Sequence, residues 1–345
     1  MNADAQELLW TGFHGLDAAE VELGFKPGGI VLFARNLDAD PERGPARAHA
    51  LIQGLQARWG SKTPLAVAID QEGGAVSRLR VWTGPTPTLH QIWMLGGAQA
   101  CERWGKRWGR GLRLLGINVD FAPVADLFDG HEGTGLGDRA ASADPRETAQ
   151  AAGAFMAGLE AEGVRGCLKH FPGLGGTRID SHKGLPELDD ADGISKNLGP
   201  FLSLAHEDRL VMVAHLKTPF TQGLPASLHR GTVAENPWGI QARWLPDDLE
   251  MGGCAAWPWP DRVRRCLEAG HQALLVCQTP EGIQACAEAA AGLPETLWAP
   301  ALKAFRCLRA NLSAGPSFGV LPFDAPAWEV WLRELREAAQ RELRG

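Results

Sequence analysis

The sequence predicts an α/β protein folded as a (β/α)₈ barrel, also called a TIM barrel. Short apolar runs rich in β-branched residues recur eight times along the 345 residues, and the stretches between them are long enough for helices. Runs that are apolar throughout and alternate with helices are typical of a parallel sheet covered on both faces. Eight such units in roughly 280 residues suit a closed barrel better than an open doubly wound sheet.

The eight candidate strands follow one another at intervals that leave room for helices. They occupy residues 11–14, 29–33, 65–69, 117–121, 164–170, 210–215, 240–245 and 273–277. The first and seventh runs are the weakest, so we expect irregular strands there. Two of the intervening stretches, 41–59 and 144–162, carry apolar residues at three-to-four spacing, which predicts helices.

The C-terminal part of the chain differs from the repeating pattern. From Pro316 the sequence is typical of a linker, and residues 328–343 form a charged amphipathic pattern. We therefore expect two parts: residues 1–315 as the barrel, and 316–345 as a linker and a helix packed on its outside.

Composition limits the classes of partner. The net charge is −7 with acids and bases interspersed, so we expect no nucleic-acid and no membrane partner. No apolar run approaches the roughly 20 residues that cross a bilayer, and the N-terminus lacks a basic-then-apolar signal pattern. Seven cysteines without CxxC or CxxxH spacing give no zinc motif. We expect a cytoplasmic monomer that holds no metal and no cofactor.

Polar residues gather where the predicted strands end. Six of the eight runs carry one at or just after the C-terminal edge, and in a barrel these edges converge on the face where active sites lie. Helix capping would explain one such residue more easily than six. The edge residues are Arg35-Asn36, residues 70–72, Asp120, Lys169-His170, His215 and Asp247-Asp248.

The stretch from Gly163 to Leu188 is the most informative part of the chain. After Lys169 and His170 come a proline and several glycines, which predict a loop. Within this loop Asp180 and His182 are two residues apart, so in extended backbone their side chains point the same way. A carboxylate beside an imidazole fixes the tautomer of the ring and suits it to proton transfer. The alternative is a solvated loop histidine beside a capping aspartate.

Taken together, these residues resemble glycoside hydrolase family 3, and within it the single-domain bacterial β-N-acetylhexosaminidases (NagZ type). Eight segments carry the resemblance in family order, from about residue 28 to 280. They are GGIVLFARN at 28–36, IDQEGGAVSRL at 69–79, GINVDFAPVADL at 116–127, GDRAASADP at 137–145, KHFPGLGGTRIDSHKGLPEL at 169–188, VMVAHL at 211–216, PAS at 225–227 and DDLEMGG at 247–253.

The resemblance implies a barrel enzyme that removes terminal N-acetylglucosamine with retention of configuration and without a metal. The implied substrates are small cell-wall-derived saccharides such as muropeptides. Asp247 matches the family nucleophile. His182, with Asp180 behind it, matches the acid/base group that protonates the leaving oxygen and then activates water.

The remaining matches are to sugar-binding positions. Asp70 matches the acid that binds hydroxyls at the non-reducing end, and we expect His215 to line the same pocket. Two alternatives stay open: Arg78 as a surface ion-pair partner and His215 as a satisfied core histidine. We read Asp248 as a helix N-terminal residue rather than a second nucleophile. The full set of implied sugar-binding residues is Asp70, Arg78, Arg139, Lys169, His170 and His215.

The Lys169–His170 pair presents a geometric difficulty. Neighbouring strand residues point to opposite faces, yet the resemblance implies that both line one pocket. We therefore predict irregular backbone there, either a bulge or a non-proline cis peptide bond.

Four residues depart from the family pattern. Leu174 and Gly176 stand where a histidine and an acid are usual, Ala75 replaces an arginine, and Pro246 replaces the serine before the nucleophile. These departures leave two alternatives open. One is a family 3 glycosidase or phosphorylase with another substrate, and the other is a catalytically idle sugar-binding protein.

Overall fold

The computed structural model describes residues 2–60, 63–128, 130, 135–312 and 322–344. Eight parallel strands form one sheet in the order β10-β1-β2-β3-β6-β7-β8-β9. Their bounds are β1 Leu9–Thr11, β2 Gly29–Leu32, β3 Ala66–Ile69, β6 Val119–Asp120, β7 Arg165–Phe171, β8 Leu210–Val213, β9 Arg243–Pro246 and β10 Leu274–Val276.

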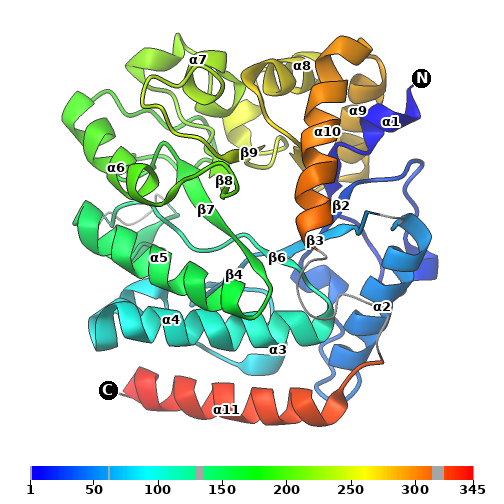
Figure 1. Ribbon diagram of the computed structural model, residues 1–345, viewed down its shortest axis with the longest axis vertical. Helices are drawn as coiled ribbons and strands as arrows, with labels where there is room; N and C mark the ends of the chain where they lie inside the picture. Colours follow the sequence, from blue (N-terminus) through cyan, green and yellow to red (C-terminus); the bar gives the residue numbers. More distant parts are fainter. Residues whose placement is uncertain (1, 61–62, 129, 131–134, 313–321, 345) are drawn as a thin grey trace.

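Backbone hydrogen bonds join the two end strands of the sheet. The Gln272 N–H donates to the Trp244 carbonyl at 3.0 Å, and the Leu249 N–H donates to the Leu275 carbonyl at 2.9 Å. Because these residues flank or belong to β9 and β10, the sheet returns on itself as a nearly closed barrel with helices around it (Figure 1). The predicted barrel is therefore confirmed.

The eight predicted strands are all present, with shifts at the two weak ones. β1 begins at Leu9 rather than at residue 11, and β9 covers Arg243–Pro246 rather than 240–245. Trp10 accounts for the first shift, because its indole is fully buried and donates to the Ile30 carbonyl at 3.0 Å. The apolar pattern places this strand imprecisely because it is only three residues long.

Helices follow most strands along the chain. α5 shows how the local sequence starts one: the Asp144 carboxylate accepts from the backbone N–H groups of Arg146 and Glu147, and Pro145 occupies the first turn. The connection from β1 to β2 carries only the short 3₁₀ helix η1 (Ala18–Glu20). The main helices are α2 Gly44–Trp59, α4 Leu89–Leu115, α5 Pro145–Ala161, α6 Ala191–Leu204, α7 Arg230–Val233, α8 Trp259–Ala269, α9 Pro280–Ala291 and α10 Glu295–Leu312.

One insertion matters for the site. After β3 the chain forms a small antiparallel hairpin, β4 (Gln71–Gly73) and β5 (Val76–Ser77), followed by α3 (Arg80–Thr83). The sequence did not predict this hairpin as strands. It lies directly after the C-terminal end of a barrel strand, so its side chains can reach the mouth of the barrel.

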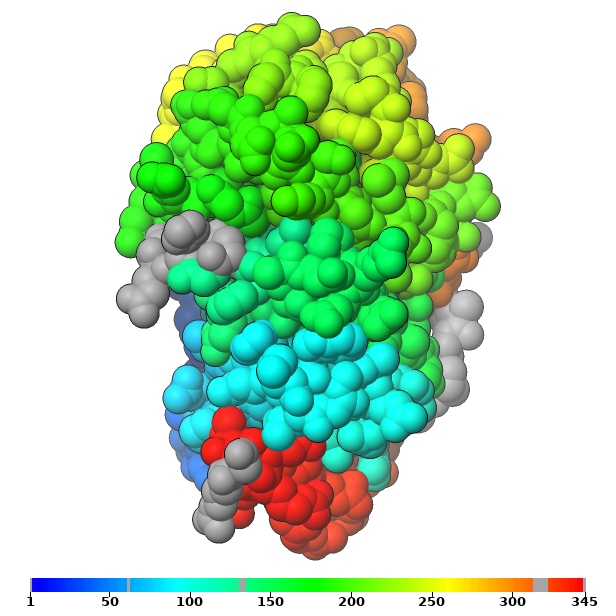
Figure 2. Space-filling view, turned by 90° about the vertical axis from the view of Figure 1, so that its left-hand side faces the viewer, coloured from blue at the N-terminus to red at the C-terminus, as the bar shows by residue number. Residues whose placement is uncertain are grey.

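The C-terminal helix α11 (Ala325–Arg344) packs against α4 on the outside of the barrel (Figure 1), as the red and cyan segments of Figure 2 also show. The Trp331 indole donates to the Arg107 carbonyl at 2.7 Å, and a Cβ at Gly111 would lie 2.1 Å from that ring. Glycine at 111 thus permits the close approach of the two helices.

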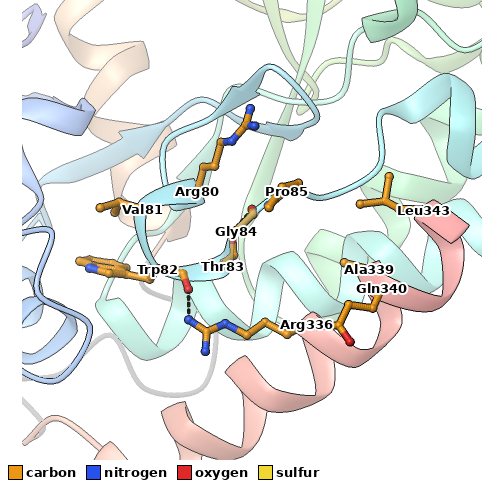
Figure 3. Close-up of a pocket in the computed structure, with 10 residues that line it drawn as sticks. All are labelled: Arg80, Val81, Trp82, Thr83, Gly84, Pro85, Arg336, Ala339, Gln340 and Leu343. Atoms are coloured by element: carbon orange, nitrogen blue, oxygen red, sulfur yellow. Dashed lines mark hydrogen bonds between the residues drawn. The ribbon is translucent and has the colours of Figure 1, made fainter.

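A cluster of indole rings fills this interface. The ring centroids of Trp108 and Trp331 are 6.3 Å apart, and those of Trp331 and Trp328 are 4.4 Å apart. The Trp328 ring centroid lies 5.6 Å from that of Trp82 in α3. Arg336 of α11 also donates to the Trp82 carbonyl (Figure 3), at the edge of a groove of about 590 Å³ between α3 and α11.

Residues 316–321 of the predicted linker lie outside the described residues, and the boundary between 1–315 and 316–345 stays a prediction. Over the described ranges, each helix is too short or too polar to cross a bilayer. The seven cysteines are free thiols, and six of them are buried.

Candidate active site

A cavity of about 270 Å³ lies at the C-terminal ends of the barrel strands. Apolar side chains come from β2, β8 and β10 and from the residue that follows β6, and charged side chains come from β7 and from the residues that follow β3 and β9. The cavity is thus lined partly by apolar groups and partly by acids and bases. Its lining residues are Val31, Phe33, Asp70, Glu72, Val76, Arg78, Phe121, Arg139, Lys169, His170, His182, Met212, Asp247, Asp248, Met251, Leu275, Cys277 and Gln278.

An ion-pair network surrounds Lys169 on one side of the cavity. The Lys169 Nζ atom lies 2.6 Å from Glu72 Oε1 and 3.0 Å from Asp70 Oδ1. Arg139 binds both Glu72 oxygens at 2.8 Å, and Arg78 lies 3.2 Å from Asp70 Oδ2. The network therefore fixes two carboxylates and three cations at the cavity, where they can bind polar groups of a ligand.

The network also determines the protonation of its members. Burial alone would raise the pKa of Glu72, but Arg139 and Lys169 hold that pKa well below its usual value. Burial likewise opposes the charge on Lys169, but Glu72 and Asp70 raise its pKa. The pKa of Asp70 is lowered in the same way, mainly by Lys169 and Arg78 against the effect of burial. All three groups are charged at neutral pH.

Lys169 and His170 both line the cavity although they are neighbours in β7. The peptide bond between them is cis, and the strand register with β8 shifts between Lys169 and Phe171. The predicted irregular backbone is therefore confirmed.

A buried aspartate holds His170 in place. Asp126 Oδ2 lies 2.7 Å from His170 Nδ1 and accepts from the His170 N–H at 3.2 Å. Asp126 Oδ1 accepts from the Leu174 N–H at 2.7 Å. Asp126 is fully buried, and its carboxylate binds both the imidazole and the start of the following loop.

The Asp180–His182 pair forms as the sequence predicted, but by a different local geometry. Asp180 Oδ1 lies 2.9 Å from His182 Nδ1 and accepts from the His182 N–H at 3.0 Å. The segment is a turn rather than extended backbone, because the Lys183 N–H donates to the Asp180 carbonyl at 2.8 Å. The assumption of extended backbone was wrong, and the turn is what brings the two side chains together.

His182 extends from this turn into the cavity. Its side chain is 70% exposed, whereas that of Asp180 is 19% exposed and lies behind it. Burial raises the pKa of Asp180, but hydrogen bonds from His182 outweigh burial and hold it below its usual value. The carboxylate is therefore charged and able to orient the ring.

Asp247 lies at the end of β9. Its N–H donates to the Val213 carbonyl at 2.9 Å, and its Oδ1 accepts from the Asp248 N–H at 2.8 Å. Asp247 and His182 thus line one cavity although 65 positions separate them (247 − 182).

The neighbouring Asp248 is almost fully buried. Burial raises its pKa to about 6, against hydrogen bonds from the Glu250 N–H and Gln278. The next described helix, η6 (Gly252–Cys254), has Met251 as its N-cap, so the reading of Asp248 as a helix N-terminal residue was wrong. Asp248 instead lines the cavity beside the more exposed Asp247.

His215 is not among the described residues that line the cavity, so the expectation that it lines the pocket was wrong. It is fully buried, with Nδ1 2.7 Å from Ser227 Oγ and Nε2 2.8 Å from the Asp248 carbonyl. This placement is that of the satisfied core histidine, and it supports the backbone next to Asp247.

Two residues that the structure places at the site, Glu72 and Asp126, were given no role by the sequence analysis. Glu72 belongs to the polar strand end at 70–72, and Asp126 lies in the segment 116–127, so both were visible but unassigned. Their partners come from distant parts of the chain, which a linear pattern does not show.

The four departures occupy different environments. Leu174 is buried in an apolar cluster and Pro246 is a buried residue of β9, whereas Ala75 and Gly176 are exposed. None of the four is among the residues that line the cavity.

Known proteins resemble this chain over most of its length. The model of the glycosyl hydrolase family 3 N-terminal domain matches residues 18–297. The chain is 38% identical over 223 residues to the beta-hexosaminidase LpqI of Mycobacterium tuberculosis, covering 63% of this chain and 55% of that protein. The chain therefore spans just over half the length of that relative. It is 33% identical over 272 residues to a beta-hexosaminidase of Methylococcus capsulatus, covering 76% and 79% of the two chains.

Solved structures give the same assignment. A family 3 β-N-acetylglucosaminidase from Paenibacillus sp. superposes with a TM-score of 0.81 at 26% identity, covering 98% of this chain and 68% of that one. A family 3 member from Mycobacterium smegmatis superposes with a TM-score of 0.78 at 30% identity, covering 90% and 96%. The chain belongs to glycosyl hydrolase family 3.

Proposed function

We propose that this protein is a retaining exo-β-N-acetylglucosaminidase that acts on small, cell-wall-derived saccharides. One observation carries the proposal: Asp247 and the Asp180-supported His182 line the same cavity as the Lys169 ion-pair network. A carboxylate and a proton-transfer group around one sugar site are what retention requires. The names of the relatives, beta-hexosaminidase and β-N-acetylglucosaminidase, support the choice of sugar.

In the first step, Asp247 is the nucleophile. Its carboxylate oxygen attacks the anomeric carbon, and the bond from that carbon to the leaving-group oxygen breaks. His182, in its protonated form, gives a proton to the leaving oxygen. The network of Asp70, Arg78 and Lys169 binds the sugar hydroxyls and so keeps the anomeric carbon near Asp247.

In the second step, the roles of His182 reverse. The neutral imidazole takes a proton from water, the water oxygen attacks the anomeric carbon, and the bond to Asp247 breaks. Two inversions at one carbon give overall retention. Asp180 remains charged throughout and orients the ring through its contact with Nδ1.

Assays of 4-nitrophenyl N-acetyl-β-D-glucosaminide with wild type and Asp247→Ala test this proposal. We expect turnover by the wild type, release of the β-anomer as seen by NMR, and a loss of more than about a thousandfold in kcat for the variant. Release of the α-anomer, or full activity in Asp247→Ala, would contradict the mechanism.

Two further assays address the alternatives. Phosphate added to the reaction would yield the sugar 1-phosphate if the enzyme were a phosphorylase, because a neutral imidazole does not repel the incoming anion. An idle sugar-binding protein would bind N-acetylglucosamine in calorimetry but turn over no glycoside. For the saccharide class, release of N-acetylglucosamine from purified muropeptides is the expected result.

A further inference from the structure

The loop from 172 to 190, which carries Asp180 and His182, is attached to the barrel at both ends. Near its start, the Asn197 side-chain amide donates to the Gly175 carbonyl at 2.8 Å. Near its end, the Leu188 N–H donates to the Lys217 carbonyl at 3.0 Å, and the Lys217 N–H donates to the Pro186 carbonyl at 2.9 Å. These contacts fix the ends of the loop but do not themselves determine where His182 lies.

The middle of the loop lies against two glycines that follow the nucleophile. The Gly252 N–H donates to the His182 carbonyl at 3.3 Å, and the Gly253 N–H donates to the Ser181 carbonyl at 3.1 Å. Both glycines belong to the short 3₁₀ helix η6 (Gly252–Cys254), which begins five residues after Asp247 in the chain (252 − 247). The segment that carries the nucleophile therefore contacts the segment that carries the acid/base group.

The approach at Gly252 leaves no space for a side chain. A Cβ there would lie 2.8 Å from the His182 carbonyl oxygen, 2.8 Å from the Lys183 carbonyl carbon and 2.9 Å from the Gly184 nitrogen. All three atoms belong to backbone, so no side-chain rotation can relieve the clash. Gly252 is not one of the residues with positive φ, so its own conformation does not require glycine. Glycine is required at 252 by the close approach of the loop.

We infer that Gly252 is a positioning residue that determines where His182 stands relative to Asp247. This inference rests on the proposed function, in which His182 is the acid/base group. With glycine at 252, the backbone at His182 lies directly on η6, and the imidazole enters the cavity. Any side chain at 252 moves that backbone outward and takes the imidazole away from the anomeric carbon.

The variant Gly252→Ala tests the inference. Misplacing an acid/base group costs most where a poor leaving group needs a proton, because general acid catalysis contributes about 10²- to 10⁴-fold. We expect kcat/KM for phenyl N-acetyl-β-D-glucosaminide to fall by about 10- to 100-fold, and that for the 4-nitrophenyl substrate by about threefold or less. Equal losses on both substrates would overturn the inference.

Azide provides a readout that a merely structural defect would not change. In the glycosyl–Asp247 intermediate, azide attacks the anomeric carbon, a carbon–nitrogen bond forms, and the bond to the Asp247 oxygen breaks to release the carboxylate. Azide is already an anion, so no base is needed. Azide acts on the second step, which limits kcat but not kcat/KM for an activated substrate that needs little acid catalysis. We therefore expect azide to raise kcat for the 4-nitrophenyl substrate in both Gly252→Ala and His182→Ala and to yield the β-glycosyl azide. A defective Gly252→Ala that azide does not restore would overturn the inference.

Gly24→Ala is the matched control. A Cβ at Gly24 would have its nearest contact 3.8 Å away, at the end of the Gln284 side chain, and Gly24 also lacks a positive φ. It should behave as wild type on both substrates and show no effect of azide. If the wild type and Gly24→Ala turn over neither substrate, the proposed function fails, whereas normal behaviour of Gly252→Ala in an active enzyme overturns only the role of Gly252.

A measurement on the wild type covers the case in which Gly252→Ala does not fold. The amide protons of Gly252 and Gly253 have carbonyl partners on the loop, so they exchange with solvent only when the loop moves away. We expect exchange at both amides to be slower than in an unstructured peptide by at least about tenfold. Exchange at the unprotected rate would show that the loop does not lie on η6 in solution.

Discussion

Glu72 shows how single side chains define the electrostatics of the site. Lys169 and Arg139 both bind it, and its side chain is only 6% exposed. The sequence suggested Asp70 as the carboxylate of this region, but Glu72 also binds two cations and is more buried than Asp70, whose side chain is 18% exposed. Its importance depends on Lys169 and Arg139, which are 97 and 67 positions away (169 − 72 and 139 − 72) and meet it only in the fold.

Replacing Glu72 by Gln should lower the free energy of unfolding by about 3–5 kcal/mol at pH 7, because Lys169 and Arg139 then lose a buried partner. The folded pKa of Glu72 lies below its unfolded value of about 4.3, so its stabilisation is present above that pH and is lost as the pH falls below it. Urea unfolding at pH 7 measures the first effect, and a pH series from 7 down to about 2 measures the second.

Glu235→Gln is the control for Glu72→Gln. Glu235 pairs with Arg230, but both side chains are more than half exposed, so its loss should have little effect. Equal stability of the two variants would contradict a dominant role for the Glu72 network.

His182→Ala should separate the two steps of the proposed mechanism. In the proposed mechanism the ring must be protonated in the first step and neutral in the second. Wild-type turnover should therefore pass through a maximum, with the first step slowing as pH rises and the second slowing as pH falls. In the variant, kcat/KM should fall by about 10²- to 10⁴-fold for substrates with poor leaving groups, and much less for substrates with activated aryl leaving groups. Stopped-flow and steady-state kinetics across pH provide the check, and an unchanged pH profile would remove His182 from this role.

The strands and helices were largely predictable because their signals are local. Apolar runs such as Leu65–Ile69 and the cap at Asp144 specify their elements without help from distant residues. The hairpin β4–β5 was not predicted because each of its strands has only two or three residues. The Asp180–His182 pair was predicted from its spacing, yet the turn that forms it was not, because the glycine-rich loop has no periodicity.

At the scale of elements, α11 is held to the barrel by few large side chains. Trp331 is 1% exposed and packs against Gly111 of α4. Trp331→Ala should lower the free energy of unfolding by about 3–5 kcal/mol, because a buried indole is replaced by a cavity. Glycosidase kcat/KM should stay within about twofold of wild type, since α11 lies outside the barrel on α4, away from the cavity.

Chemical denaturation and assays at 25 °C test this prediction. Leu343→Ala, at a 44% exposed position of the same helix, is the control and should change neither the free energy of unfolding nor kcat/KM measurably. A large loss of activity in Trp331→Ala without a loss of stability would contradict the separation of α11 from the site.

At the scale of the whole molecule, the barrel depends on contacts between the two ends of its sequence. β1 pairs with both β2 and β10, so an N-terminal strand completes the sheet. Beside it, the fully buried Arg309 of α10 binds Glu7 and donates to the Pro64 carbonyl at 2.8 Å. Three parts of the chain therefore meet at one guanidinium group.

Glu7→Gln should lower the free energy of unfolding by about 3–5 kcal/mol, because Arg309 is left with an uncompensated buried charge. The ion pair joins N-terminal and C-terminal segments of one barrel, so we expect the barrel to unfold as a unit. Along a urea gradient, the helical circular dichroism signal and the enzyme activity should therefore be lost together in both the wild type and Glu7→Gln. Glu329→Gln, at an exposed position of α11, is the control. Loss of activity well before loss of helix signal would contradict closure by this pair.

The indole cluster between α3, α4 and α11 has a spectroscopic consequence. The chain has 13 tryptophans and no tyrosine, so its ultraviolet emission comes from indole alone. None of the described residues that line the cavity is a tryptophan, whereas four indoles lie in contact at the docking face of α11. Intrinsic fluorescence of this protein therefore reports the attachment of its C-terminal helix far more than the occupancy of the candidate active site.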